Sequence, residues 1–346
     1  MSENIDKQVR EDEFYAQKYY FSYSALNRLS YAPQMFYRHY VLNQRDDKMT
    51  DALLQGKIIH CKLLDDGSFD NNFILLPGTM PGDNAKAIVQ KIYEEWKELR
   101  PEGVTLKDYK TRIIEILKEI NLHQALTDDK KAPMLTGDDK RLEKIATQQN
   151  DDYFEFLKRS EGRDVVDIET LDYCVSVVDV LKQNSEVDAL LGLSAGEENV
   201  QVFNELPIQM ELAGRPFGLK GILDNVKVDF DKKVIQVNDL KTTSKSISDF
   251  QESVDYWNLW MQAAIYDTMV RETFLRSNDI DETDWSVEFT FIVVDKYTQV
   301  YPFRVSPESM VIWKAKLEQK ILEAEWHYTN RNYSLPYVFA TSKVTL

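Results

Sequence analysis

Two aspartates and one lysine in this chain have the types and spacing of an acidic catalytic cluster. Asp239 and Lys241 lie two residues apart in the β-branched segment 234–243, and Asp224 ends the apolar segment before it. The polar residues 229–233 between the two segments predict a hairpin of two strands. Because side chains alternate across a strand, Asp239 and Lys241 share one face, and the antiparallel neighbour can bring Asp224 beside them.

A cluster of two carboxylates and one ammonium group is costly to bury unless a cation completes the set. Its oxygen-rich character suits a hard divalent ion such as Mg²⁺. The plainer interpretation is a solvated hairpin whose charges are incidental, and the short motif alone leaves that alternative open. Motifs elsewhere in the chain help to decide between the two.

The stretch resembles the core of the PD-(D/E)xK nuclease superfamily, where an aspartate ends one strand and a D/E-x-K motif ends the next. Asp224 is then the first element, and Asp239-Leu-Lys241 is the second. Three further motifs, in the family's order, make the chain similar to the RecB-type and RecE-type exonuclease branch. They are G-x-x-x-H at 56–60, E-x-P at 205–207 and Q-x-x-x-Y at 262–266.

The resemblance implies an α/β fold, with a restriction-endonuclease-like core in which a central mixed β-sheet of about five strands is flanked by helices. We expect a charged N-terminal arm at 1–18, an N-terminal helical part of the nuclease domain carrying G-x-x-x-H at 19–80, a helical insertion at 81–195 and the nuclease core at 196–346. Apolar residues at helical spacing predict helices within 21–40, 50–65, 88–99, 106–120, 142–157, 168–181, 249–274 and 307–328.

The resemblance also implies roles for individual residues. The metal, Mg²⁺ with Mn²⁺ as a substitute, would be held by Asp224, Asp239, the Leu240 carbonyl and His60. A lone histidine on an apolar helix face is more often a core residue, and the G-x-x-x-H resemblance favours the metal. The ion would polarise the scissile phosphate and acidify a water, while Lys241 orients that nucleophile. Glu205 would act through a water or help to place its strand. The candidate contacts to DNA are Thr242, Thr243, Gln262, Tyr266, Ser22 and Ser24.

The function implied by the resemblance is digestion of double-stranded DNA from its ends, with 5′→3′ polarity, for recombination or repair. Lambda-type and RecE-type relatives further imply a homo-oligomeric ring and a single-strand annealing protein as partner. Two alternatives remain: another DNA end-processing nuclease of the CRISPR-associated or helicase-coupled kind, and a non-catalytic DNA-binding protein on the nuclease fold. The missing cysteines and the absence of a Walker motif count against both kinds of end-processing nuclease. Retention of the three charged residues of the D/E-x-K core counts against a non-catalytic protein.

The charge balance restricts how the chain could bind nucleic acid. With 42 Lys and Arg against 58 Asp and Glu, the formal net charge is −16. Generic nucleic-acid binders neutralise phosphates with basic residues, so this chain must concentrate its few basic stretches, such as 241–245, and use divalent ions. A ring that turns these stretches inward would keep the acidic faces away from the duplex.

Cysteine usage and hydropathy indicate the compartment. Cys61 and Cys174 are the two cysteines, too few for a four-cysteine cluster. Ala32 precedes Pro33 where iron–sulfur members of the family carry a cysteine, so we expect no iron–sulfur cluster. No apolar run reaches the roughly 18 residues of a membrane span, and the N-terminus is too charged for a signal peptide. We expect no membrane contact and a cytoplasmic protein of a bacterial or phage-infected bacterial cell.

Overall fold

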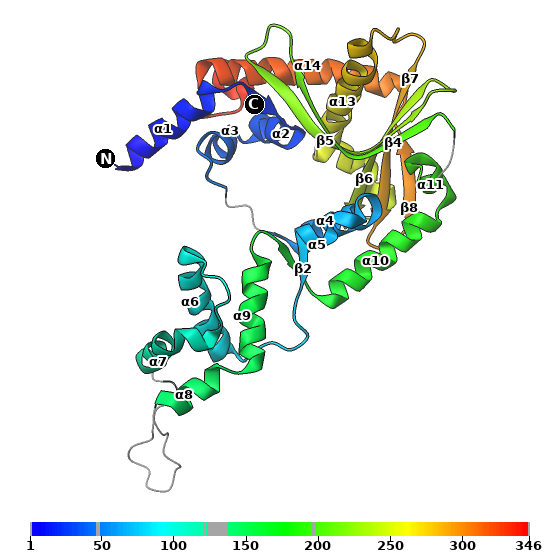
Figure 1. The fold of residues 1–346 in the computed structure, drawn as a ribbon. Coiled ribbons are helices and arrows are strands. Elements are labelled where there is room, and N and C mark those ends of the chain that lie inside the picture. Colours follow the sequence, from blue (N-terminus) through cyan, green and yellow to red (C-terminus); the bar gives the residue numbers. More distant parts are fainter. Residues whose placement is uncertain (1, 46–48, 121, 123–137, 195–197, 345–346) are drawn as a thin grey trace. The chain divides into compact units, whose positions relative to one another are not determined.

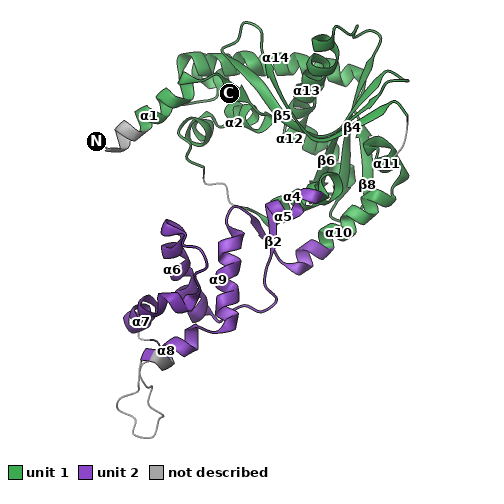
Figure 2. Ribbon diagram, viewed as in Figure 1, with its two compact units in different colours: residues 1–66, 173–346 green, residues 67–172 purple. Residues whose placement is uncertain are grey.

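The computed structural model describes residues 2–45, 49–120, 122, 138–194 and 198–344. The chain divides into two compact units, residues 1–66 with 173–346, and residues 67–172 (Figure 2). The first unit carries the large sheet and every residue assigned a chemical role above. The second unit lies largely within the expected insertion at 81–195, whereas residues 173–195 belong to the first unit.

In its described part, unit 1 contains a six-stranded mixed sheet (Figure 1). The strand order is β1-β5-β6-β7-β8, and β4 also pairs with β5. The pairs β1–β5 and β6–β7 are parallel, and the other neighbours are antiparallel. The strands are β1 (Tyr19–Phe21), β4 (Val200–Glu211), β5 (Phe217–Asp229), β6 (Val234–Thr243), β7 (Ser286–Asp295) and β8 (Val300–Arg304). The expected α/β fold with a central mixed sheet is confirmed.

The strand β1 is absent from the sequence-based prediction, which has a helix begin near Phe21. Tyr19 pairs with Phe217, so the strand depends on a partner almost 200 residues away. The helix begins only after Ser22, whose hydroxyl caps it by accepting a hydrogen bond from the Ala25 amide. It is also divided by Pro33 into α2 (Tyr23–Tyr31) and α3 (Pro33–Phe36).

Helices cover both faces of the sheet (Figure 1). The most buried is α13 (Leu259–Val270), in which every residue except Thr268 is buried. Such a helix is apolar on all sides because it packs between the sheet and α14 (Pro307–Asn330). The helix predicted at 249–274 is interrupted, because Asn258 adopts a left-handed backbone with φ of 54° and separates α12 (Phe250–Tyr256) from α13.

The N-terminal segment is a helix, α1 (Ser2–Ala16), whose aromatic residues Phe14 and Tyr15 pack against the core of unit 1. Unit 2 has an apolar core of its own, built by α6 (Asp83–Leu99), α7 (Lys110–Glu119) and α9 (Gln148–Ser160). The remaining elements are α4 (Asp51–Leu64), α5 (Phe69–Asn72), β2 (Phe73–Leu75), α8 (Asp138–Ile145), β3 (Asp164–Val166), α10 (Ile168–Gln183), α11 (Ser185–Leu191) and α15 (Tyr337–Thr341). Among the described helices, none has the length and apolar character needed to cross a membrane.

Candidate functional site

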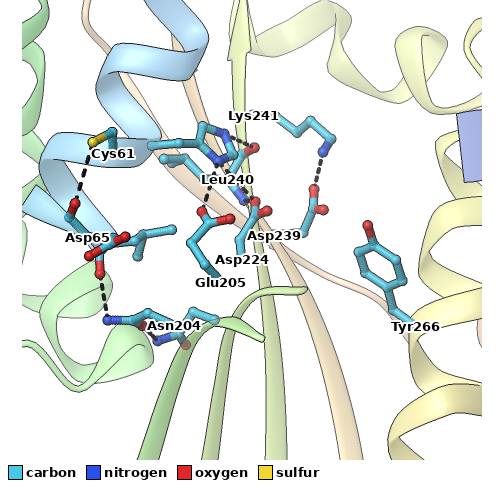
Figure 3. A network of polar contacts seen from close by, with 12 residues as sticks. Cys61, Asp65, Asn204, Glu205, Asp224, Asp239, Leu240, Lys241 and Tyr266 are labelled. Carbon is cyan, nitrogen blue, oxygen red and sulfur yellow. Dashed lines mark hydrogen bonds and ion pairs between the residues drawn. The ribbon is translucent and has the colours of Figure 1, made fainter. Parts of the chain in front are cut away.

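The site begins where the pairing of β5 and β6 ends. Their register stops at Asn225 opposite Asn238, one residue short of the two aspartates. Beyond that point the Asp224 carboxylate accepts a hydrogen bond from the Leu240 amide at 2.7 Å. In a continuous ladder the acceptor for this amide would be a backbone carbonyl of β5. Asp224 and Asp239 therefore both lie where the two strands separate (Figure 3).

The neighbouring strand β4 adds a third carboxylate. Glu205 has a φ of 48°, a left-handed conformation that is uncommon outside glycine, within a strand that is otherwise regularly paired to β5. β4 has β5 as its partner in the described sheet, so Pro207 lies on an edge strand, where its missing N–H is tolerated. Glu205 projects towards Asp224 and the α4 helix (Figure 3).

The helix α4 brings His60 to the carboxylates. A Cβ atom at Gly56 would lie 3.3 Å from the Thr242 hydroxyl, so the glycine permits close approach of α4 to β6. His60 Nε2 lies 3.0 Å from the Leu240 carbonyl, which can only accept, so Nε2 carries the proton and Nδ1 the lone pair. That Nδ1 atom is 3.6 Å from an Asp224 oxygen and 4.0 Å from a Glu205 oxygen.

Asp239 is held on the other side of the opening. One of its oxygens forms an ion pair with Lys241, and the other accepts a hydrogen bond from the Gln262 amide at 2.8 Å. Gln262 also donates to the Tyr266 hydroxyl at 3.2 Å, so the predicted i, i+4 pair on α13 acts as one unit. A Cβ atom at Gly221 would lie 2.6 Å from the Tyr266 ring, which shows how closely that ring packs on β5.

The buried charges perturb one another. Burial, and then the charge of Asp224, raises the pKa of Glu205 to about 7. Burial raises the pKa of Asp239 to about 6 against the opposing effect of Lys241, and it also raises the pKa of Asp224. Burial and the positive charge of Lys241 lower the pKa of His60 to about 4, so His60 is neutral at neutral pH. The three carboxyl groups are harder to ionise than usual, and His60 beside them carries no charge. The site therefore has too little positive charge to balance three carboxylates, even with Lys241, and a divalent cation would supply it.

The donor set fits such a cation. Ligand atoms of His60, Glu205 and Asp224 all lie within 4.8 Å of one another. An imidazole nitrogen and carboxylate oxygens are ligands that Mn²⁺ accepts, and the oxygens suit Mg²⁺. Asp239 lies beside this triad, and the Leu240 carbonyl is occupied by His60.

Comparison with known proteins identifies the family. The chain matches the model of the PD-(D/E)XK nuclease superfamily over residues 20–330. It belongs to that superfamily. Nucleases of this superfamily generally use divalent metals, in agreement with the donor set described above.

Solved structures and curated sequences add little to that assignment. A protein from Eubacterium rectale named "Putative exonuclease" is 14% identical, with a TM-score of 0.44 over 94% of this chain and 86% of that one. The protein SSO0001 is 12% identical, with a TM-score of 0.23 over 77% of this chain and 98% of the other. No curated protein sequence matches the chain.

The predicted DNA contacts of this nuclease lie in two places. Thr242 faces Gly56 of α4, and the Thr243 hydroxyl accepts a hydrogen bond from the Lys245 amide at 3.1 Å. Ser22 and Ser24 are instead hydrogen-bonded to each other at 3.0 Å and line a separate polar cavity of about 260 Å³. The other residues lining that cavity are Tyr19, His39, Tyr40, Asn43, Arg45 and Lys220.

A row of asparagines supports the site and is absent from the sequence-based prediction. Asn204, Asn225 and Asn238 lie opposite one another on three adjacent strands, and their amides are linked in series at 2.8 Å. Asn204 also donates to the Leu64 carbonyl at the end of α4 at 3.0 Å, and Asn225 donates to the Leu191 carbonyl at the end of α11 at 3.0 Å. Each asparagine adjoins one of the three acids, a sequence signal that could have identified the row.

Proposed function

We propose that this chain is a divalent-metal-dependent exodeoxyribonuclease that digests double-stranded DNA from its ends. The observation that carries the proposal is the convergence of His60, Glu205 and Asp224 beside the Asp239–Lys241 ion pair. A nuclease needs a cation for the phosphate and a group that acts on the attacking water, and these residues offer both. Mg²⁺ is the proposed ion, with Mn²⁺ as a substitute.

His60, Glu205 and Asp224 would hold the ion, with Asp239 and the Leu240 carbonyl next to them. When bound, the ion polarises the scissile phosphate and lowers the pKa of a water. Lys241, held by Asp239, would orient that water and stabilise the negative charge that develops on the phosphate. Gln262 keeps the Asp239 carboxylate turned towards Lys241, because it occupies the second oxygen.

The polar cavity supports cleavage near a DNA end. Lys220 and Asp224 lie on the same face of β5, four residues and therefore about 13 Å apart along the strand. The cavity that contains Lys220, Ser22 and Ser24 also contains Arg45, and hydroxyls with cationic groups are the donors that phosphate prefers. A terminal phosphate in this cavity would place an internal phosphodiester near Asp224. Thr242, Thr243, Gln262 and Tyr266 remain the proposed contacts next to the metal.

The order of the motifs is that of the RecB-type and RecE-type branch. This order supports 5′→3′ digestion in recombination or repair in the cytoplasm, with a single-strand annealing protein as partner. The net charge of −16 supports a ring that encloses the duplex, because enclosure gives processivity without strong electrostatic attraction.

The test uses linear duplex DNA labelled separately at each 5′ end, together with a covalently closed circle, with and without Mg²⁺ or Mn²⁺. We expect metal-dependent loss of linear DNA from ends and no attack on the circle. Degradation of the circle at the rate of the linear form would contradict the exonuclease assignment. Equal activity after exhaustive chelation would contradict metal dependence.

A further inference from the structure

The junction between α12 and α13 exposes two adjacent aromatic side chains. Tyr256 is 71% exposed and Trp257 is 56% exposed. Their ring centroids are 4.6 Å apart and the rings are nearly perpendicular, at 88°. The Lys245 ammonium lies 5.9 Å from the centre of the Tyr256 ring. The face formed by these three residues, called here the aromatic platform, combines large apolar surface with one cation.

The backbone beneath the aromatic platform is held firmly. The Trp257 carbonyl accepts hydrogen bonds from the Tyr23 hydroxyl and from the Asn27 amide, the latter at 3.1 Å. Asn258, in its left-handed conformation, donates to the Asn27 side chain at 2.8 Å and accepts from the Trp260 indole at 3.0 Å. Exposed aromatic rings on a fixed backbone are pre-organised for binding, since little freedom remains to be lost.

The aromatic platform lies close along the chain to the residues that hold Asp239. Gln262, which donates to Asp239, lies in the first turn of α13, and Trp257 lies two residues before that helix begins. Lys245 follows Lys241 by four residues at the end of β6. Two short segments of chain therefore connect the platform to groups that touch Asp239.

We propose that the aromatic platform stacks an unpaired base of the DNA strand whose phosphodiester lies in the metal site. The proposal rests on the proposed function in taking DNA as the substrate, and it adds that this strand is single-stranded at the point of cleavage. Stacking on an aromatic ring accepts any base and is worth about fivefold to a hundredfold in affinity per base. It also suits a chain of net charge −16, because stacking does not depend on neutralising phosphates.

The first test measures binding of a short fluorescent oligodeoxythymidylate to the full chain by anisotropy. The chain carries Asp239→Asn to prevent cleavage, and Mg²⁺ is present. We expect Trp257→Ala to raise Kd at least about fivefold, and Trp257→Phe, which keeps a ring, to stay within about twofold. Lys245→Ala should lower the slope of log Kd against log salt by about 0.7, the value for one phosphate contact on a single strand.

The matched control is Phe230→Ala. Phe230 is 45% exposed and packs edge-on against Trp285, which is half-buried, so it is also an exposed aromatic ring in contact with a second one. It lies six residues beyond Asp224, about 20 Å along β5 and past its far end. This variant should bind the oligonucleotide as the parent does. Equal binding by Trp257→Ala and Phe230→Ala would overturn the proposal.

A second test changes the DNA and leaves the protein intact. An abasic nucleotide is moved along the oligonucleotide, and we expect weaker binding when it occupies the position of the stacked base. In Trp257→Ala that loss should disappear, because the base and the ring are coupled. An equal loss of binding in the parent and in Trp257→Ala would overturn the proposal. It would also be overturned if Trp257→Ala bound the oligonucleotide normally but formed an assembly of different size, as measured by light scattering. If the coupling between the base and the Trp257 ring is found but the wild-type protein does not cleave DNA from its ends, only the exonuclease assignment would be contradicted.

Discussion

Replacing Asp239 by asparagine should stabilise the metal-free protein at neutral pH while abolishing cleavage. The side chain is fully buried, and burial together with Asp224 raises its pKa from 3.8 to about 6 despite Lys241. A rise of roughly two units means that the folded state disfavours the charged form by about 3 kcal/mol. Asparagine keeps the shape and the acceptor for Gln262 but carries no charge.

The sign of the pH dependence follows from proton binding. The unfolded aspartate ionises above about pH 3.8 and the folded one above about pH 6, so the folded state binds more protons within that window. Stability of the metal-free wild type therefore falls as pH rises through the window, and the variant lacks this loss. The ion pair with Lys241 is also lost, so we expect a net gain of about 1 to 2 kcal/mol, or a few degrees in Tm.

Thermal unfolding in excess chelator, at several pH values from about 4 to about 7.5, provides the assay. The Tm advantage of Asp239→Asn should grow with pH and shrink when Mn²⁺ is added, because metal stabilises the wild type more. Asp267→Asn is the control, since that aspartate is equally buried but contacts both Arg271 and Lys314. Its replacement should cost about 3 kcal/mol or more. A less stable Asp239→Asn, or a gain independent of pH, would refute the reasoning.

Four further outcomes are expected. Lys241→Ala should remove most single-turnover activity while changing Mn²⁺ affinity by calorimetry less than Asp239→Asn does, because the ammonium acts on the nucleophile and not on the ion. Mn²⁺ affinity should rise with pH through about 7, the pKa of Glu205, and Glu205→Gln should flatten that dependence. Asn225→Leu should lower stability by about 1 to 3 kcal/mol in urea unfolding, because the Asn238 amide then loses one of its two acceptors and the Leu191 carbonyl loses the Asn225 donor. Gly221→Ala should displace the Tyr266 ring, so that turnover falls clearly while Tm changes little. An unchanged rate would show that the position of this ring is unimportant.

The sequence by itself determined the elements that carry the site. Period-two alternation in 234–243 places Asp239 and Lys241 on one face, and helical spacing places His60 one turn after Gly56. These are local properties, because each depends on residues within a turn or a strand.

The tertiary structure alone decided how those elements meet. The pairing of β5 with β6 stops one residue before the two aspartates, and β1 forms only because a distant strand offers it hydrogen bonds. The left-handed conformations of Glu205 and Asn258 likewise have no signal in their residue types strong enough to predict them. Register and backbone exceptions depend on the packing of segments far apart in the chain, and periodicity within one segment carries no information about them. That packing turns Glu205 towards Asp224 and leaves Trp257 exposed.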